Sequence, residues 1–561
     1  MTPSRRRTIA LTLGIAGALL RLWQYLGRGS FWLDEAAIAR NVVARDPSGL
    51  LRPLDFAQIA PKGFLLVEKL ASSSLGTGDH ALRLYSLLCA LAALPLFYAL
   101  ARRALSEPGA LLAFAFFALL SRPIYYASEA KQYSGDIFFA CLLLLLGLRV
   151  FAPDTAPRHW LRLGGLGAIA VWFSQPALFV GVGIALALVV GVLQRRVPLR
   201  WPAVVACILW LVTGLPSIWL TIHSLGPAEY AYMQSFWSDG FWPLVPHSLH
   251  DAAWPFLNLY GLFRDPLGMP VGVVGLALFV VGVVAFAHRR PVTLAALAGP
   301  LLVLYAASAL GVFPFATTLH GFDKIAAGNG RVLMFLVPSL VLLVTAGIMV
   351  LLDSPLLRVR RTGVAAAALV IGAPLYYDLT TLPWSPNDLT QVLAAIHREA
   401  KPGDRLYVHY AGLHPFEWYR ARVPIADDHV VRGGCYRPAW REYLRELDAF
   451  RGTGRLWVVV VHPAWVNGVH EGAVIEQYLD HVAPKLGRWG ESDSFALLYD
   501  FGRVTPLRGP PPSWHPPPRA LAQDTVPLGM SCAGIFPSWG PGAAAPARSL
   551  SPPFAGARAR P

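Results

Sequence analysis

Long apolar runs separated by short polar stretches make up roughly the first 380 residues of the chain. A helix needs about 20 consecutive apolar residues to cross the hydrocarbon core of a membrane, and these runs approach or reach that length. The pattern therefore predicts an α-helical polytopic membrane protein with about eleven transmembrane helices. We place them at residues 8–27, 81–101, 108–126, 134–152, 161–175, 177–194, 202–222, 268–287, 292–312, 332–352 and 363–378.

The pattern changes after the last of these runs. Helices are predicted at 387–400 and 471–486, and strands at 405–410, 455–462 and 494–500. Alternating helices and strands are typical of a small α/β domain, whereas the final segment has no periodicity and is expected to be disordered. The predicted domains are a transmembrane domain at 1–378, a soluble extracytoplasmic α/β domain at 379–503, and a tail rich in Pro, Gly and Ala at 504–561.

Composition and charge agree with this class and set its orientation. Hydrophobic residues make up 55% of the chain and charged residues 14%, which excludes an ordinary soluble protein. The net charge of +15 lies largely in arginine clusters, which in membrane proteins mark cytoplasmic loops, so we predict no nucleic-acid partner. The N-terminus is predicted to be cytoplasmic and the α/β domain to lie outside the cell or in the periplasm. The clusters are Arg5 to Arg7, Arg102 with Arg103, Arg158 with Arg162, Arg195 with Arg196, Arg289 with Arg290, and Arg358 with Arg360 and Arg361.

Cysteine and histidine patterns assign no metal and no cofactor. The five cysteines have no CxxC spacing, so neither a disulfide framework nor a zinc site is predicted. One group of residues has a spacing that could bind a divalent metal ion. It consists of His247, His250 and Asp251, and His320 and Asp323 could join it. Histidines in a Trp-rich interfacial loop are more often plain surface residues, so the need for a metal stays open.

The first candidate for chemistry is a pair of adjacent carboxylates, Asp34 and Glu35, directly after the first span. They are surrounded by aromatic residues and precede a short helix predicted from Ala36 to Arg45. The free N–H groups at a helix start stabilise a carboxylate. Asp34 is therefore either part of a site at the membrane surface or simply the N-cap of this helix.

The second candidate is the short loop between the third and fourth spans, which contains Glu129 and Lys131. Charged residues at a span boundary are costly unless they are solvated, paired or functional. If the next helix begins near Glu129, Tyr133 and Asp136 share its face, and Lys131 points elsewhere, towards lipid phosphate. The alternative is an ordinary snorkelling lysine within an interfacial tyrosine belt.

Several segments together resemble a known family. They are Asp34-Glu35, Asp79-His-Ala-Leu-Arg83-Leu-Tyr-Ser-Leu-Leu with the span that follows it, and Tyr125-Tyr-Ala-Ser-Glu-Ala-Lys-Gln-Tyr133. This ordered set is similar to glycosyltransferase family 39, the group of protein O-mannosyltransferases and lipid A aminoarabinose transferases, which has the GT-C fold. The resemblance covers residues 8–195, agrees only in hydropathy over 196–378, and does not extend to the α/β domain.

The resemblance implies a glycosyltransferase that uses a polyprenyl-phosphate sugar donor at the outer face of a bacterial-type inner membrane. The sugar would pass, with inversion, to a glycolipid, a polysaccharide or a protein. Asp34 matches the family's first-loop acidic residue, Glu35 its neighbour, and Glu129 the second-loop acidic residue. We expect Asp34 to be the general base and the two glutamates to orient the acceptor or the base.

Cations are needed to hold the departing phosphate. Lys131 lies where such a cation is plausible, and we add Arg331, at the outer mouth of a span, on the residues alone. Arg331 is equally explained as a snorkelling boundary arginine. Tyr133 and Asp136 are expected to contact the substrate.

Two other functions fit the hydropathy. A transporter or flippase of lipid-linked sugars predicts charges near the bilayer midplane and broken helices in repeated halves. A non-catalytic scaffold predicts that the first-loop carboxylates are dispensable and that the outer domain binds a partner. For that domain, a binding rim of His409, Tyr410, His414 and Trp418 is conceivable.

Overall fold

The computed structural model describes residues 2–152, 154–317, 329–436, 441–466, 469–491 and 493–505. The chain divides into two compact units, residues 1–388 and 389–561. Residues 379–388, which the sequence analysis assigned to the soluble domain, thus belong to the helical unit. Of the predicted tail, only Val504 and Thr505 fall within the described residues.

The helical unit contains eight described helices that are long and apolar enough to cross a membrane. Each overlaps a predicted span, so the polytopic membrane fold is confirmed. The helices are α1 (Pro3–Gly27), α4 (Asp79–Ala104), α7 (Tyr133–Val150), α10 (Trp201–Ile222), α13 (Gly272–Arg289), α14 (Pro291–Ala309), α15 (Val337–Leu352, extended to Gly330 by a 3₁₀ turn) and α16 (Leu357–Thr381).

The other three predicted spans are helical but shorter, so the count of eleven is not confirmed. The span predicted at 108–126 is broken into α5 (Glu107–Ala118) and α6 (Ser121–Tyr126). The other two correspond to α8 (Pro157–Phe173) and α9 (Ala177–Leu193), each of 17 residues. The break after α5 matters for function, because the chain from Leu119 to Lys131 is buried inside the unit. Irregular backbone at such depth is tolerated where protein surrounds it.

Small residues allow the long helices to pack closely. A Cβ atom on Gly282 of α13 would lie 1.9 Å from the Leu343 carbonyl oxygen of α15, and one on Gly347 would lie 2.0 Å from that of Leu278. Glycine is required at both positions because backbone faces backbone, the usual way in which membrane helices associate without a hydrophobic driving force.

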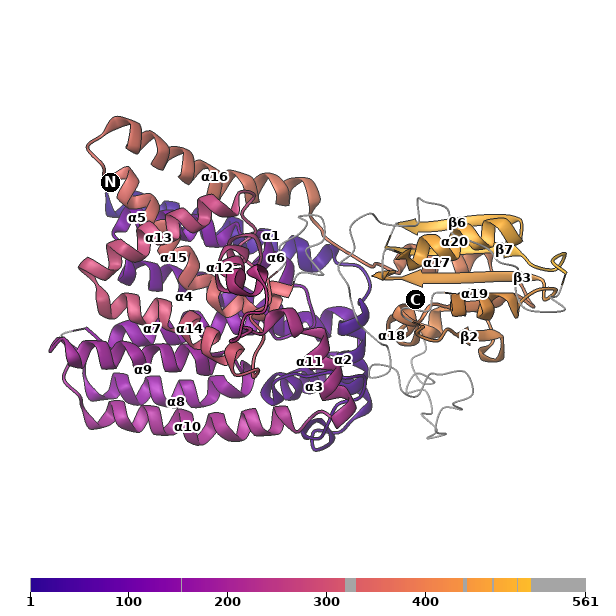
Figure 1. The fold of residues 1–561 in the computed structure, drawn as a ribbon, viewed down its shortest axis with the longest axis horizontal. Coiled ribbons are helices and arrows are strands. Elements are labelled where there is room, and N and C mark those ends of the chain that lie inside the picture. Colours follow the sequence, from indigo (N-terminus) through magenta and orange to yellow (C-terminus); the bar gives the residue numbers. More distant parts are fainter. Residues whose placement is uncertain are drawn as a thin grey trace. The chain divides into compact units, whose positions relative to one another are not determined.

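The arginine clusters and the candidate site fall at opposite ends of the helices. Arg290, at the end of α13, donates from its guanidinium to the carbonyls of Arg103 and Ala104 at 3.1 and 2.9 Å, so two of the clusters meet in space. The short helices α2 (Leu33–Ala44), α3 (Lys62–Leu75) and α11 (Pro227–Phe236) gather at the end away from the N-terminus (Figure 1). A further helix, α12 (Leu249–Arg264), precedes α13.

The second unit is a small α/β domain, as predicted. Its five-stranded sheet has the order β2-β1-β3-β7-β6, with β1 parallel to β2 and β3, and β7 antiparallel to β3 and β6. Strand β3 carries an unbroken apolar run because it is buried between two neighbours. The strands are β1 (Arg405–Val408), β2 (Val430–Arg432), β3 (Arg455–Val461), β6 (Lys485–Glu491) and β7 (Ser494–Asp500), with a β4 (Trp465–Val466) and β5 (Val469–His470) ribbon beside the sheet.

The described part of the second unit also contains four α-helices, and two of them were not predicted. Helices α17 (Thr390–Glu399) and α20 (Glu471–Val482) lie where helices were expected, whereas α18 (Leu413–Trp418) and α19 (Arg441–Asp448) were missed. Cys435 is disulfide-bonded, although the cysteine spacing predicted no disulfide framework. Single widely spaced cysteines gave no sequence signal for this bond.

Candidate active site

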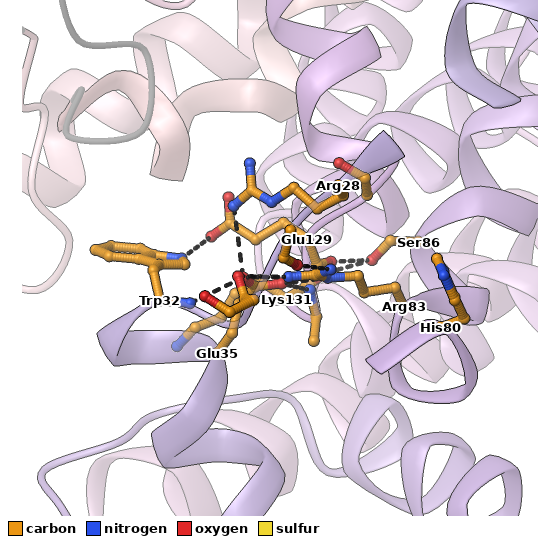
Figure 2. Close-up of polar contacts among 12 residues, drawn as sticks. Arg28, Trp32, Glu35, His80, Arg83, Ser86, Glu129 and Lys131 are labelled. Atoms are coloured by element: carbon orange, nitrogen blue, oxygen red, sulfur yellow. Dashed lines mark hydrogen bonds and ion pairs between the residues drawn. The ribbon is translucent and has the colours of Figure 1, made fainter. Parts of the chain in front are cut away.

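The centre of the site is a buried ion pair between the first outer loop and α4. Arg83 donates through Nε and one terminal nitrogen to the two oxygens of Glu35, at 2.9 and 3.0 Å (Figure 2). Both side chains are fully buried. Arg83 also donates to the carbonyls of Gly29 and Ser30 at 2.8 and 3.2 Å. Glu35 therefore anchors the loop to α4 from a fully buried position, and its expected role in orienting the acceptor or the base stays a prediction.

A second arginine and two backbone amides complete the surroundings of Glu35. Arg28 lies 3.5 Å from the carboxylate and donates to the Tyr125 hydroxyl at 2.9 Å. The amides of Ala130 and Trp32 donate to the carboxylate at 2.9 and 3.3 Å. The amide of Ala130 belongs to the loop that carries Glu129, so one carboxylate ties both predicted acidic segments together.

Glu129 lies beside this pair but has a different environment. One carboxylate oxygen accepts from the Trp32 indole nitrogen at 3.3 Å, and the other has no hydrogen-bond partner among the described residues. The Ser86 hydroxyl contacts the carbonyls of Glu129 and Lys131 at 2.6 and 2.8 Å, which fixes the turn from the α4 side. Glu129 is thus held in place by its backbone, while one buried oxygen of its carboxylate accepts no hydrogen bond from the described residues.

Asp34 faces the cations that were predicted to hold phosphate. Its carboxylate lies 4.0 Å from a terminal nitrogen of Arg331, and its side chain is 20% exposed. The Arg331 guanidinium also stacks over the Trp237 ring at 5.5 Å. Asp34 lies in the first turn of α2, and Trp32 rather than Asp34 is the N-cap, so capping does not explain this residue.

Lys131 and Tyr133 lie on the same side, although the local structure differs from our expectation. Helix α7 begins at Tyr133 rather than near Glu129, and Lys131 lies in the turn before it. The Lys131 ammonium is buried and donates to the Gln58 amide oxygen at 2.7 Å, so it does not snorkel to lipid. Tyr133 adjoins Arg331, and Asp136 is buried one turn further along α7. Substrate contact by Tyr133 and Asp136 stays a prediction.

The two buried glutamates differ in proton affinity. Burial raises the pKa of Glu129 to about 7, assisted by the neighbouring charge of Glu35 and opposed by Arg28. Burial acts in the same direction on Glu35, but Arg83 and Arg28 outweigh it and hold the pKa of that carboxyl below its ordinary value. Environments that separate the pKa values of neighbouring carboxyls are typical of acid–base sites.

The raised pKa of Glu129 predicts a pH dependence of stability. Between its ordinary value of 4.5 and about 7, the folded state binds a proton that the unfolded state does not. Stability must therefore fall as the pH rises through this window. We expect the melting temperature of the detergent-solubilised wild type to fall more from about pH 5 to about pH 8 than that of Glu129→Gln. Parallel profiles for the two proteins would contradict the assignment.

Several residues of the site were not assigned a role from the sequence. No sequence pattern marked Arg28, Gln58 or Ser86 as part of the site, because their partners are distant in the chain. Arg83 was marked by one, since a charged residue at the start of an apolar span is a functional candidate by default, yet we used it only as part of a resemblance.

The weaker candidates do not form a second site. Among the described residues there is no group of three or more His, Cys, Asp or Glu side chains placed to hold a metal ion. Asp251 accepts a hydrogen bond from the His247 amide, while His320 and Asp323 lie outside the described residues. In the second unit His409, Tyr410 and His414, three residues of the binding rim we considered, are buried.

Comparison with known proteins gives one family match. The model of the dolichyl-phosphate-mannose-protein mannosyltransferase family matches residues 63–219. The predicted resemblance to the protein O-mannosyltransferase group is thereby confirmed over a segment that contains Arg83, Glu129 and Lys131 but begins after Asp34. No curated protein sequence matches the chain significantly.

Two solved structures have a similar arrangement at low identity. One is ArnT from Cupriavidus metallidurans bound to undecaprenyl phosphate, which is 14% identical, with 89% of this chain and 99% of that chain covered and a TM-score of 0.48. The other is the oligosaccharyltransferase AglB from Archaeoglobus fulgidus in complex with an inhibitory peptide and a dolichol-phosphate. It is 14% identical, with 87% of this chain and 74% of that chain covered and a TM-score of 0.47.

Proposed function

We propose that this chain is a membrane glycosyltransferase that moves a sugar from a polyprenyl-phosphate donor to an acceptor at the outer face of the inner membrane. The carrying observation is the juxtaposition of an accessible carboxylate, Asp34, with the cations Arg331 and Lys131 at one end of the helical unit. The family match over residues 63–219 supports the same reaction class. The acceptor is a glycolipid, a polysaccharide or a protein.

The proposed reaction is a direct displacement at the anomeric carbon. Asp34 takes the proton from the acceptor hydroxyl or amine, and the acceptor atom forms a bond to the anomeric carbon. The bond from that carbon to the phosphate oxygen breaks, and polyprenyl phosphate leaves with the electron pair. Attack from the opposite face inverts the anomeric centre through an oxocarbenium-like transition state.

The cations act on the leaving group, which is already anionic and needs little protonation. Arg331 and Lys131 approach Asp34 from different elements, and no acidic side chain forms a salt bridge with Lys131 within 4.0 Å among the described residues. Burial lowers the pKa of Lys131, with the charge of Asp34 acting against it. An anionic phosphate placed here would be stabilised by both side chains as charge develops on the bridging oxygen.

The arginine clusters orient the proposal. They occupy the helix ends opposite Asp34, and basic residues are enriched on the cytoplasmic side, so the site faces outwards. A disulfide at Cys435 is typical of an oxidising compartment, which supports an extracytoplasmic second unit. The N-terminus is then cytoplasmic.

A flippase and a scaffold are the alternatives, and one assay separates all three. Purified protein is supplied with a polyprenyl-phosphate sugar in vesicles, and free polyprenyl phosphate and glycosylated acceptor are measured. Release of polyprenyl phosphate supports the glycosyltransferase. Movement of the donor across the bilayer without release supports the flippase. If neither release nor movement is observed, the scaffold is supported. Each of these two results overturns the proposal.

A further inference from the structure

The segment that follows α16, residues 382–388, forms a brace for the loops of the site. We call it the brace segment. Leu382, Trp384 and Asn387 in it are buried. The peptide groups of Trp384 pair with the Gln24 side chain of α1. The Trp384 amide donates to the Gln24 oxygen at 2.7 Å, and the Gln24 nitrogen donates to the Trp384 carbonyl at 2.8 Å. An amide side chain carries both a donor and an acceptor, so this one glutamine pairs with both peptide groups of a single residue.

Through Gln24 the brace segment reaches the loop that carries Glu129. The same Gln24 nitrogen donates to the Ser128 hydroxyl at 3.0 Å, one residue before Glu129. Arg28 makes a parallel link, because it donates to the Trp384 carbonyl at 3.0 Å and also contacts Glu35. The side chains of Gln24 in α1 and of Arg28, the residue after α1, therefore connect the brace segment with both acidic segments.

Two further side chains of the brace segment hold the loop that leads into Asp34. The Gly29 amide donates to the Ser385 hydroxyl at 2.8 Å, and the Ser30 amide donates to the Asp388 carboxylate at 2.8 Å. A Cβ atom on Gly29 would lie 2.3 Å from that carboxylate, so glycine is required for this approach. Arg83 bonds the carbonyls of the same two residues, and the loop is therefore held from both sides.

From this geometry we propose that Gln24, Ser385 and Asp388 are positioning residues for the transfer reaction, an inference that rests on the proposed function. They fix the backbone on the N-terminal side of both Asp34 and Glu129. Because α2 begins only three residues after Ser30, a shift of this loop moves Asp34 relative to Arg331. A misplacement of about 1 Å in such a site costs on the order of 100-fold in rate.

The test compares a variant that loses both side-chain acceptors with one that keeps them. The first is Ser385→Ala with Asp388→Ala, and the second is Ser385→Thr with Asp388→Asn, which retain a hydroxyl and a carbonyl oxygen. We expect kcat to fall by about 10- to 100-fold in the first and to stay within about threefold of wild type in the second, with the KM for the donor nearly unchanged in both. Thr380→Ala, an exposed hydroxyl on α16, is the matched control.

Hydrogen exchange of the peptide covering residues 28–36 provides a readout that needs no turnover. We expect faster exchange in the alanine variant and protection close to wild type in the conservative variant. Equal kcat in the two double variants, or a loss of kcat with unchanged exchange, would overturn the proposal. If the alanine variant does not fold, Ser385→Ala alone is compared with Ser385→Thr by the same measurements. A wild type that releases no polyprenyl phosphate refutes the proposed function, whereas exchange still decides whether the brace segment orders the loop.

Discussion

Replacing Asp34 by asparagine is expected to lower turnover of the lipid-linked sugar by a factor on the order of 10²–10⁴. Asparagine has the same shape but cannot accept the acceptor's proton. Because the Asp34 side chain is partly exposed and lies 4.0 Å from Arg331, the substitution leaves the buried contacts of the loop intact. The loss should therefore appear in kcat, while the melting temperature of the solubilised protein changes little.

Asp55→Asn is the matched control for this prediction. Asp55 lies in the same outer loop, its side chain is 64% exposed, and it pairs with Arg45 at 2.7 Å. The chemical change is identical, but no reacting group is affected, so we expect turnover close to wild type. Wild-type turnover in Asp34→Asn would exclude Asp34 as the base and would direct attention to Glu129, which has one carboxylate oxygen without a hydrogen bond among the described residues.

Replacing Arg83 by glutamine is expected to destabilise the folded protein by about 3–5 kcal/mol, because it leaves the fully buried Glu35 without its main partner. Arg28, at 3.5 Å, compensates only in part. The measurement is the melting temperature and the folded yield in detergent. Turnover should fall as well, since the loop that carries Asp34 loses its attachment to α4.

The double variant Arg83→Gln with Glu35→Gln tests the cause of this loss. Removing both charges takes away the unpaired buried carboxylate, so the melting temperature should recover in part. Arg149→Gln is the control, because Arg149 pairs with Asp154 in an exposed bridge, which contributes about 0–1 kcal/mol. A double variant less stable than Arg83→Gln alone would show that the charge pair is not the source of the effect.

The sequence predicted the helices of the helical unit correctly where hydropathy determines their position. The burial of long apolar runs in lipid depends on local composition, so each of the eight described helices that are long enough to cross a membrane overlaps a predicted span. The span predicted at 108–126 failed because its second half is buried by protein rather than by lipid, which permits the break between α5 and α6. Hydropathy cannot distinguish these two kinds of apolar surroundings.

The sequence by itself determined that this chain crosses a membrane many times, that an α/β unit follows, and that acidic and basic side chains gather next to span ends. These properties follow from composition and from short-range spacing. Only the tertiary structure showed that the adjacent residues Asp34 and Glu35 have different surroundings. Successive residues of a helix point about 100° apart, so one carboxylate faces Arg331 and the other is enclosed by Arg83 and Arg28. Glu35 and Arg83 lie 48 positions apart in the chain, and Gln24 and Trp384 lie 360 positions apart. Only packing brings such distant partners together.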